Sequence, residues 1–217
     1  MSAKEFPDRA GTVIVGAGIV GNSLAYHLAR MGRDDIVLMD KGPLPDPGGS
    51  TGHASNFLMP VDHSKEMTHL TQRSIEQYKE MDTYNESGGI EVARTEERLA
   101  ENHRRMQSAK AWGEPAELLS PEEVEELVPY IDTDVIEGGF YTPGAGVCDP
   151  LRAGEIMRER ADAIASGEVP PDEYDAGALE VDGGVQQAQS EPASGSRGLH
   201  VFPNTEVLDM HVEDGAI

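Results

Sequence analysis

The hydrophobic residues of 12–40 follow first a strand pattern, then a helix pattern, and then a strand pattern again. The run TVIV at 12–15 is short and rich in β-branched residues, which is typical of a strand buried on both faces of a parallel sheet. The next apolar residues recur at helical spacing and stop before Gly32, a residue type that often ends a helix; they are Ile19, Val20, Leu24, Leu28 and Met31. A second apolar run, DIVLM at 35–39, leads to Asp40. The pattern predicts a strand, a helix and a second strand, the order of a βαβ unit.

Weaker periods continue along the chain. Residues 64–81 predict a helix with Ser64 as its N-cap and an apolar side made of Met67, Leu70, Ile75 and Tyr78. Further expected elements are a strand within 88–97, a charged amphipathic helix within 95–113, a helix starting at Ser120-Pro121, and a helix over 151–165. After residue 198, alternating residues predict two strands separated by Pro203-Asn204.

Three glycines follow the first predicted strand with the spacing GxGxxG: Gly16, Gly18 and Gly21. In a βαβ unit the first glycine allows a tight turn, the second lets a pyrophosphate approach the backbone, and the third lets the helix pack close to its strand. Asp40, nineteen positions after Gly21, stands where a carboxylate accepts hydrogen bonds from a ribose diol. The unit therefore predicts an adenine dinucleotide. Asp40 disfavours the 2′-phosphate of NADP, although the adjacent Lys41 weakens that preference.

The motif alone does not separate NAD from FAD, because both present the same ADP half. An NAD dehydrogenase would continue with further short βα units, whereas residues 41–60, KGPLPDPGGSTGHASNFLMP, have a loop-forming composition. Such a segment can run along an extended cofactor toward its reactive ring. In it, Ser50 and Thr51 are candidate donors to the pyrophosphate or the ring region. The loop therefore favours a flavin.

The glycine motif, the acid after the second strand and GGSTGHAS at 48–55 together resemble the FAD-dependent amine oxidoreductases of the D-amino-acid-oxidase superfamily. The resemblance is strongest to the dimethylglycine and sarcosine dehydrogenase branch, and it covers residues 11–166 and 199–217. In that branch a GST-x-HA segment carries a histidine bonded covalently to the flavin methyl group, and His53 falls on that position. The resemblance thus implies FAD held by Gly16, Gly18, Gly21 and Asp40 and tethered through His53. From residue type alone, a histidine that only donates a hydrogen bond remains the alternative.

The expected fold class is α/β: a Rossmann-like FAD/NAD(P)-binding domain with an inserted α+β substrate-domain segment, truncated relative to the family. Five segments are expected: 1–83 as the FAD-binding segment, 84–140 as part of a substrate or cap domain, 141–166 as the return to the FAD domain, 167–198 as a flexible acidic insertion, and 199–217 as an incomplete strand pair.

The resemblance implies oxidation of an N-methylated glycine, such as dimethylglycine or sarcosine, by hydride transfer from the N-methyl carbon to the flavin. Water or a folate would take up the resulting imine. Residues that handle the amine lie outside the matched region in this family, so no catalytic residue is assigned. Two alternatives stay open: another FAD-dependent oxidoreductase of D-amino-acid or glycerol-phosphate type, and a non-catalytic or degenerate FAD-binding fragment. The site would be completed by the missing C-terminal half or by a second polypeptide.

The composition of the chain narrows the classes of partner that it is expected to bind. The 217 residues contain 40 Asp plus Glu against 17 Lys plus Arg, a formal net charge of −23, which opposes binding to nucleic acid or to anionic membranes. The acids are spread along the chain as in halophilic proteins, which predicts loss of structure at low salt; a melting temperature independent of salt would contradict that reading.

The remaining sequence features concern the compartment and metals. Cys148 is the single cysteine, which excludes an intramolecular disulfide and fits a reducing compartment. No apolar run approaches the about 20 residues needed to cross a bilayer, and no signal peptide is recognised, so a cytoplasmic protein is expected. The histidines lack the paired spacing of a metal site, so no metal is expected.

Overall fold

The computed structural model describes residues 6–170 and 197–212. The chain divides into two compact units, which are best considered separately: the first comprises the residues up to 54 and from 150 onward, and the second comprises residues 55–149. Most of the predicted acidic insertion, residues 171–196, lies outside the described residues. The five predicted segments stay a prediction.

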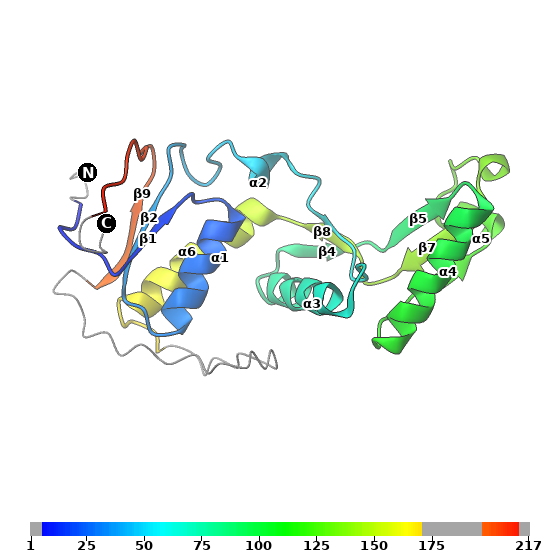
Figure 1. Cartoon of the computed structure of the whole chain (residues 1–217), viewed down its shortest axis with the longest axis horizontal. Coiled ribbons are helices and arrows are strands. Elements are labelled where there is room, and N and C mark those ends of the chain that lie inside the picture. Colours follow the sequence, from blue (N-terminus) through cyan, green and yellow to red (C-terminus); the bar gives the residue numbers. More distant parts are fainter. Residues whose placement is uncertain (1–5, 171–196, 213–217) are drawn as a thin grey trace. The chain divides into compact units, whose positions relative to one another are not determined.

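The first unit is a parallel sheet with helices on one face (Figure 1). Its elements are β1 (Thr12–Val15), α1 (Ile19–Arg30), β2 (Asp35–Met39), α2 (Ser50–His53), α6 (Pro150–Ala165) and β9 (Gly198–Phe202). The strand order is β1-β2-β9, and Ile14, Leu38 and Val201 are aligned across the sheet. Helix α1 packs on the face that carries Ile14, and α6 lies beside α1 and against β9. The predicted βαβ unit and the α/β fold class are confirmed.

The expectation that β1 is buried on both faces is wrong. In β1 only Ile14 is buried, whereas Val13 and Val15 on the other face are 55% and 60% exposed. Three of the apolar residues that predicted helix α1 are also exposed: Val20 and Leu24 by 79% and 48%, and its C-cap Met31 by 50%. Its buried residues are Gly21, Asn22, Ala25, Tyr26 and Ala29. Among the described residues β1 is an edge strand, and α1 packs chiefly against α6, β1 and β2.

The expected second strand after Pro203 is also absent from residues 205–212, and residues 213–217 lie outside the described part. A turn with Asn204 at φ 54° follows β9, and Asn204 and Thr205 donate to the carbonyls of Gly42 and Asp40 at 3.0 and 2.8 Å. These bonds attach the turn to the loop after β2. Beyond it, Leu208 is 87% exposed, and residues 205–212 pair with no described strand.

The second unit contains two small antiparallel sheets and three helices of more than one turn. Its elements are β3 (Phe57–Leu58), α3 (Lys65–Glu80), β4 (Tyr84–Glu86), β5 (Gly89–Ala93), α4 (Glu96–Ala111), β6 (Glu117–Leu119), α5 (Pro121–Leu127), the short 3₁₀ helix Thr133–Val135, β7 (Gly138–Thr142) and β8 (Gly146–Cys148). The strand orders are β3-β8-β4 and β5-β7-β6. A core cluster of Val61, Met106, Ala109, Ala116 and Phe140 lies between α4 and β7.

Helix starts in this unit follow the sequence closely. Ser64 accepts a hydrogen bond from the Met67 amide, and Ser120 forms a capping box with Glu123. The predicted apolar side of α3 is wrong in part, because Met67 and Leu70 are each 47% exposed while Thr68 and Ile75 are buried. The buried Thr68 hydroxyl accepts the Asp62 amide at 3.0 Å, so its polar group is satisfied on the inner side of the helix.

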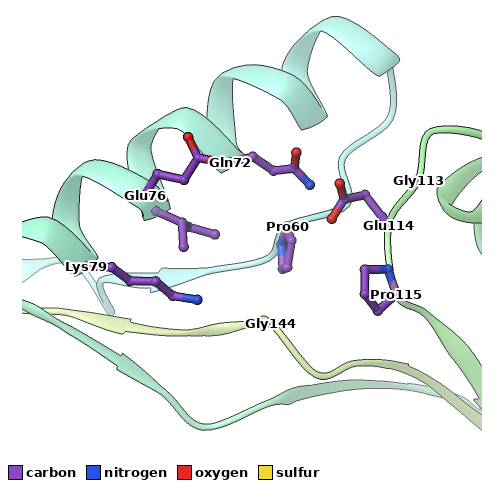
Figure 2. A pocket seen from close by; sticks show the side chains of 9 residues that line it. Pro60, Gln72, Glu76, Lys79, Gly113, Glu114, Pro115 and Gly144 are labelled. Atoms are coloured by element: carbon purple, nitrogen blue, oxygen red, sulfur yellow. The ribbon is translucent and has the colours of Figure 1, made fainter.

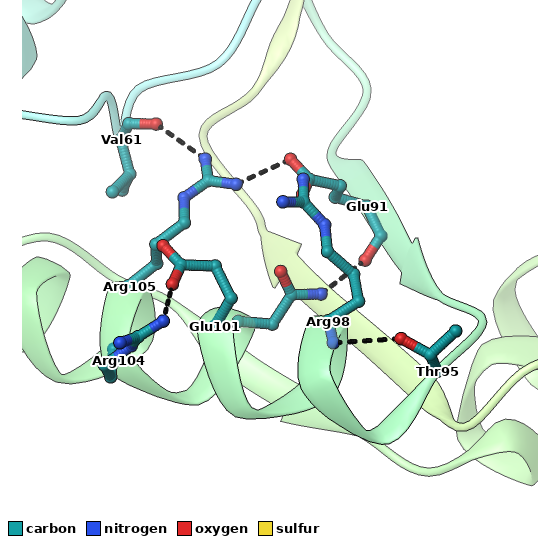
Figure 3. A network of polar contacts seen from close by, with 8 residues as sticks. Val61, Glu91, Thr95, Arg98, Glu101, Arg104 and Arg105 are labelled. Atoms are coloured by element: carbon teal, nitrogen blue, oxygen red, sulfur yellow. Dashed lines mark hydrogen bonds and ion pairs between the residues drawn. The ribbon is translucent and has the colours of Figure 1, made fainter.

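A polar network joins α4 to β5 and to the segment after β3 (Figure 3). Arg105 donates to Glu91 at 2.6 Å and to the Val61 carbonyl at 3.3 Å, and Arg98 forms a second ion pair with Glu91. Burial opposes ionisation of Glu91, but the two arginines outweigh it, so its pKa lies below the usual range. The network is therefore formed at neutral pH and is lost as the pH falls through that lowered pKa. Some charged residues of the predicted charged face of α4 therefore join this helix to β5 and to the segment after β3.

Cys148 at the end of β8 offers a test of burial in this unit. Burial raises the pKa of its thiol to about 11; a hydrogen bond with Thr83 opposes this, and the Asp149 carboxylate adds to it. Because the thiolate is the reacting species, we expect native protein at pH 8 to react with iodoacetamide about a hundredfold more slowly than the unfolded chain. Mass spectrometry with and without denaturant measures both rates, and equal rates would contradict the burial.

Candidate cofactor site

The glycine turn between β1 and α1 is held by backbone contacts that require glycine. Gly16 adopts φ +107°, which other residue types rarely reach, and its amide donates to the Met39 carbonyl at 2.8 Å. A Cβ on Gly21 would lie 1.8 Å from the Gly16 carbonyl oxygen. The third glycine of the motif therefore lets α1 begin directly against the turn.

Both backbone polar groups of Ala17, the residue between the first two glycines, are hydrogen-bonded. Its amide donates to Asp40 Oδ2 at 2.7 Å, and its carbonyl accepts from Asn22 Nδ2 at 2.7 Å. The other oxygen of Asp40 accepts the Gly42 amide at 2.8 Å. Asp40 thus connects the end of β2 to the glycine turn, and each of its oxygens retains a lone pair for a further donor.

Asn22 was not singled out from the sequence, and it extends the support of the turn to α6. Its side chain is 3% exposed, and its Oδ1 accepts from the guanidinium of Arg158 at 3.1 Å. Burial lowers the pKa of Arg158, an effect that Glu155 and Glu159 oppose. Asn22 and Arg158 are 136 positions apart in sequence, and together they hold the Ala17 carbonyl of the turn. The only available signal was a polar residue among the small residues of the helix.

Asn22→Ala should weaken the turn. The change leaves the Ala17 carbonyl and the half-buried Arg158 without this partner, at a cost of about 1–3 kcal/mol. We expect the melting temperature to fall by roughly 3–10 °C and FAD to bind more weakly. Scanning calorimetry and a flavin titration measure the two effects. Asn85→Ala, at an exposed asparagine of β4, is the control; the same small shift in both variants would contradict a supporting role for Asn22.

The histidine loop, residues 46–53, is fastened to the glycine turn. Thr51 Oγ1 accepts the amide of Ile19, the first residue of α1, at 3.0 Å. A Cβ on Gly18 would meet this oxygen at 2.9 Å, so the second glycine of the motif gives Thr51 its room. Within the loop, the Asp46 carboxylate accepts the Gly48 amide at 3.0 Å. A Cβ on Gly52 would lie only 2.9 Å from an oxygen of the same carboxylate. The small residues thus let the loop fold onto itself and onto α1.

His53 ends the one-turn helix α2 and is exposed. Its Nδ1 lies 2.9 Å from the Gly49 carbonyl oxygen. A carbonyl only accepts, so this contact places the proton on Nδ1 and leaves the lone pair of the neutral ring on Nε2. Ser50, the first residue of α2, is exposed as well, and so is Lys41. Thr51 contacts the motif, whereas the side chains of Ser50 and Lys41 do not among the described residues.

The glycine turn, the start of α1 and the end of β2 lie next to one another in the first unit. The N-terminus of α1 carries the positive end of the helix dipole, and its N-cap, Gly18, supplies no side-chain cap. The glycines leave room for a pyrophosphate, and Asp40 follows β2 at the carboxyl edge of the sheet, where a ribose is expected. The arrangement therefore fits the ADP half of FAD.

Fold and site define an α/β dinucleotide-binding protein. Residues 12–164 match the family described as FAD dependent oxidoreductase, the D-amino-acid-oxidase family, and the chain belongs to it. Family membership gives FAD as the cofactor.

Curated relatives refine the similarity. The chain is 35% identical over 156 residues to mitochondrial dimethylglycine dehydrogenase of Rattus norvegicus, covering 69% of this chain and 18% of that protein. It is 31% identical over 169 residues to mitochondrial sarcosine dehydrogenase of Homo sapiens, covering 74% and 18%. It is also 34% identical over 144 residues to a mitochondrial pyruvate dehydrogenase phosphatase regulatory subunit of Mus musculus, covering 63% and 16%. The chain thus spans less than a fifth of these proteins.

Among solved structures, the L-proline dehydrogenase of P. horikoshii is similar with a TM-score of 0.74 and 20% identity. The similarity covers 96% of this chain and 48% of that one. At this identity the comparison shows the fold alone, and it shows that the chain corresponds to about half of that structure.

A separate pocket of about 310 Å³ lies in the second unit (Figure 2). Gln72, Glu76 and Lys79 of α3 line one side of it, and Glu114 lines the other. Lys79 is also paired with Glu86. All residues that line this pocket belong to 55–149, so it contains none of the candidate cofactor residues.

Among residues 6–170 and 197–212, no helix is long and apolar enough to cross a membrane. In the same described residues, no group of three or more His, Cys, Asp or Glu side chains is placed to hold a metal ion. A cytoplasmic location, halophily and the lack of a metal stay predictions.

Proposed function

We propose that the chain is the FAD-binding part of an oxidoreductase that oxidises an N-methylated amino acid, such as dimethylglycine or sarcosine, with the flavin attached through His53. The observation that carries the proposal is the bond from the Ile19 amide to Thr51, which fastens the histidine loop to the pyrophosphate end of the expected cofactor. FAD, when bound, would accept two electrons from the amine. It would also accept two electrons as the tether forms, because a methyl C–H bond is replaced by a C–N bond to His53. An external oxidant such as oxygen would then take these two electrons.

The chain's own residues have distinct roles in this proposal. Gly16, Gly18 and Gly21 admit the pyrophosphate, Asp40 accepts the ribose hydroxyls, and Ser50 and Thr51 flank the diphosphate or the ring region. The Gly49 carbonyl holds the proton of His53 on Nδ1, so that Nε2 presents its lone pair as the attachment atom.

The substrate class rests on the relatives. Those named dimethylglycine and sarcosine dehydrogenases share 31–35% identity with the chain, and the matched region includes His53 and the glycine motif in the family range 12–164. The matched region also contains residues 84–140, the predicted part of a substrate or cap domain, and no amine-binding residue is assigned within it. That a folate accepts the carbon of the product is proposed from the family resemblance alone.

Acid denaturation tests the proposed tether. The chain is produced with riboflavin in the medium, precipitated in acid and run on a denaturing gel, and flavin fluorescence is expected to migrate with the polypeptide. Flavin found only in the supernatant would leave FAD binding but exclude the tether, as expected for a D-amino-acid or glycerol-phosphate type of oxidoreductase. Protein that stays colourless with excess FAD would exclude the proposal and favour a non-catalytic chain.

Substrate choice requires the completed enzyme. Anaerobic addition of dimethylglycine or sarcosine should bleach the flavin, while D-alanine and glycerol 3-phosphate should not. Bleaching by either of the last two alone would assign the chain to the alternative branch.

A further inference from the structure

The pocket of the second unit combines apolar and polar lining (Figure 2). Ile75 of α3, which is 6% exposed, and the buried Pro60 supply its apolar part. Gln72, Glu76 and Lys79 follow one another along α3 at intervals of four and three residues, so they lie on one face of this helix. The volume of about 310 Å³ lies within the range of small-molecule pockets, about 300–1,000 Å³. The pocket is therefore large enough for a small organic molecule.

The opposite wall of the pocket is fixed by the end of α4. The helix is followed by Gly113 at φ +86°, and the amide of Glu114 donates to the carbonyl of Ala109 at 2.8 Å. The backbone of Glu114 is therefore held at the last turn of the helix, and Glu114 lines the pocket across from α3. The C-terminus of a helix carries the negative end of the helix dipole. Helix α4 thus adds negative potential next to the carboxylate of Glu114.

The charges of the lining residues favour a cation. Lys79 already forms an ion pair with Glu86, and its ammonium group lies 5.7 Å from the centre of the Tyr84 ring. By contrast, the carboxylates of Glu76 and Glu114 have no ion pair with any residue that the structure describes. The formal net charge of the chain, −23, acts in the same direction. An anionic ligand would be repelled, whereas a cation would neutralise these two carboxylates.

We propose that the pocket binds a short aliphatic diamine, with one ammonium group at Glu76 and the other at Glu114. The two carboxylates come from different walls, and Pro60 lies between these walls in Figure 2. The methylene groups of the diamine cover Pro60 and Ile75, and the side-chain carbonyl of Gln72 accepts one of its N–H groups. A dication neutralises both carboxylates at once, which a monoamine does not. The pocket contains none of the candidate cofactor residues, so this site is independent of the proposed function.

Isothermal titration calorimetry of the full chain with 1,4-diaminobutane tests the site. We expect saturable binding of one diamine per chain, weakened by added salt because the contacts are between charges. Butylamine, with one ammonium group, and glycine betaine, with a carboxylate at its other end, should each bind about fivefold more weakly or worse. Glu76→Gln together with Glu114→Gln should weaken diamine binding by about tenfold or more. Lys79→Gln should strengthen it, because a positive charge leaves the lining.

Glu80→Gln together with Glu117→Gln is the matched control. Both acids are exposed residues of the second unit, neither lines the pocket, and the net charge changes by the same amount. This variant should bind the diamine as the unsubstituted chain does, and all variants should keep the same circular dichroism. The proposal is overturned if no saturable binding occurs, or if both double variants weaken it equally, which would indicate attraction by the overall charge alone. Butylamine or glycine betaine binding as tightly as the diamine, or weaker binding in Lys79→Gln, would overturn it as well.

Discussion

Gly21→Ala is expected to destabilise the first unit and abolish FAD binding. The new methyl group would lie 1.8 Å from the Gly16 carbonyl oxygen and 3.0 Å from its carbon. Gly16 has little freedom to move, because its φ is +107° and its amide is bonded to Met39 at 2.8 Å. We expect a loss of about 3 kcal/mol or more, and a melting temperature lower by roughly 6–12 °C.

Thermal unfolding and a fluorescence titration with FAD measure the two effects. Gly144→Ala is the control, since its Cβ would meet only Pro60 at 3.6 Å, an ordinary contact. That variant should melt and bind FAD as the unsubstituted chain does. Normal FAD affinity in Gly21→Ala would show that the turn is not the pyrophosphate site.

His53→Ala is expected to remove all flavin that survives acid denaturation while leaving FAD bound reversibly in the native protein. The substitution deletes Nε2, but it leaves Gly16, Gly18, Gly21 and Asp40 in place. Because His53 is exposed, the melting temperature of the FAD-free protein should change little. Fluorescence on a denaturing gel reports the tether, and equilibrium dialysis reports reversible binding.

His63→Ala is the matched control, at an exposed histidine of the second unit whose backbone amide is bonded to Asp62. It should keep covalent flavin. His53→Gln separates nucleophilicity from polarity, since its amide nitrogen has no available lone pair; it should behave as His53→Ala does. Covalent flavin that persists in His53→Ala would place the attachment on another residue.

Local signals in the sequence predicted the framework of the site. The GxGxxG spacing, the apolar runs around it and Asp40 were sufficient to predict β1, α1 and β2, because each depends on contacts within a few residues or on one short connection. The N-caps Ser64 and Ser120 were predicted for the same reason. The histidine loop was recognised through its resemblance to a family, whereas the reason for its glycines became clear only from the approach of Thr51 to Gly18.

Features that depend on distant contacts were missed or misjudged. Asn22 supports the turn only through Arg158, which no local pattern relates to it. The burial expected for both faces of β1 was wrong, because composition indicates what a strand is suited to, and exposure depends on which elements are present to cover it. The strand expected over 205–212 failed similarly, since alternation without a partner strand does not make a sheet.

The first unit is interrupted in sequence by the whole of the second, and this has a consequence for synthesis on the ribosome. The glycine turn and β2 emerge early, but Arg158 and β9, which support Asn22 and pair with β2, emerge after residues 55–149. The second unit, with its contacts all within one continuous stretch, can therefore fold first. Until then β2 presents an unpaired apolar edge, so nascent chains stalled between residues 54 and 150 are the ones we expect chaperones to bind.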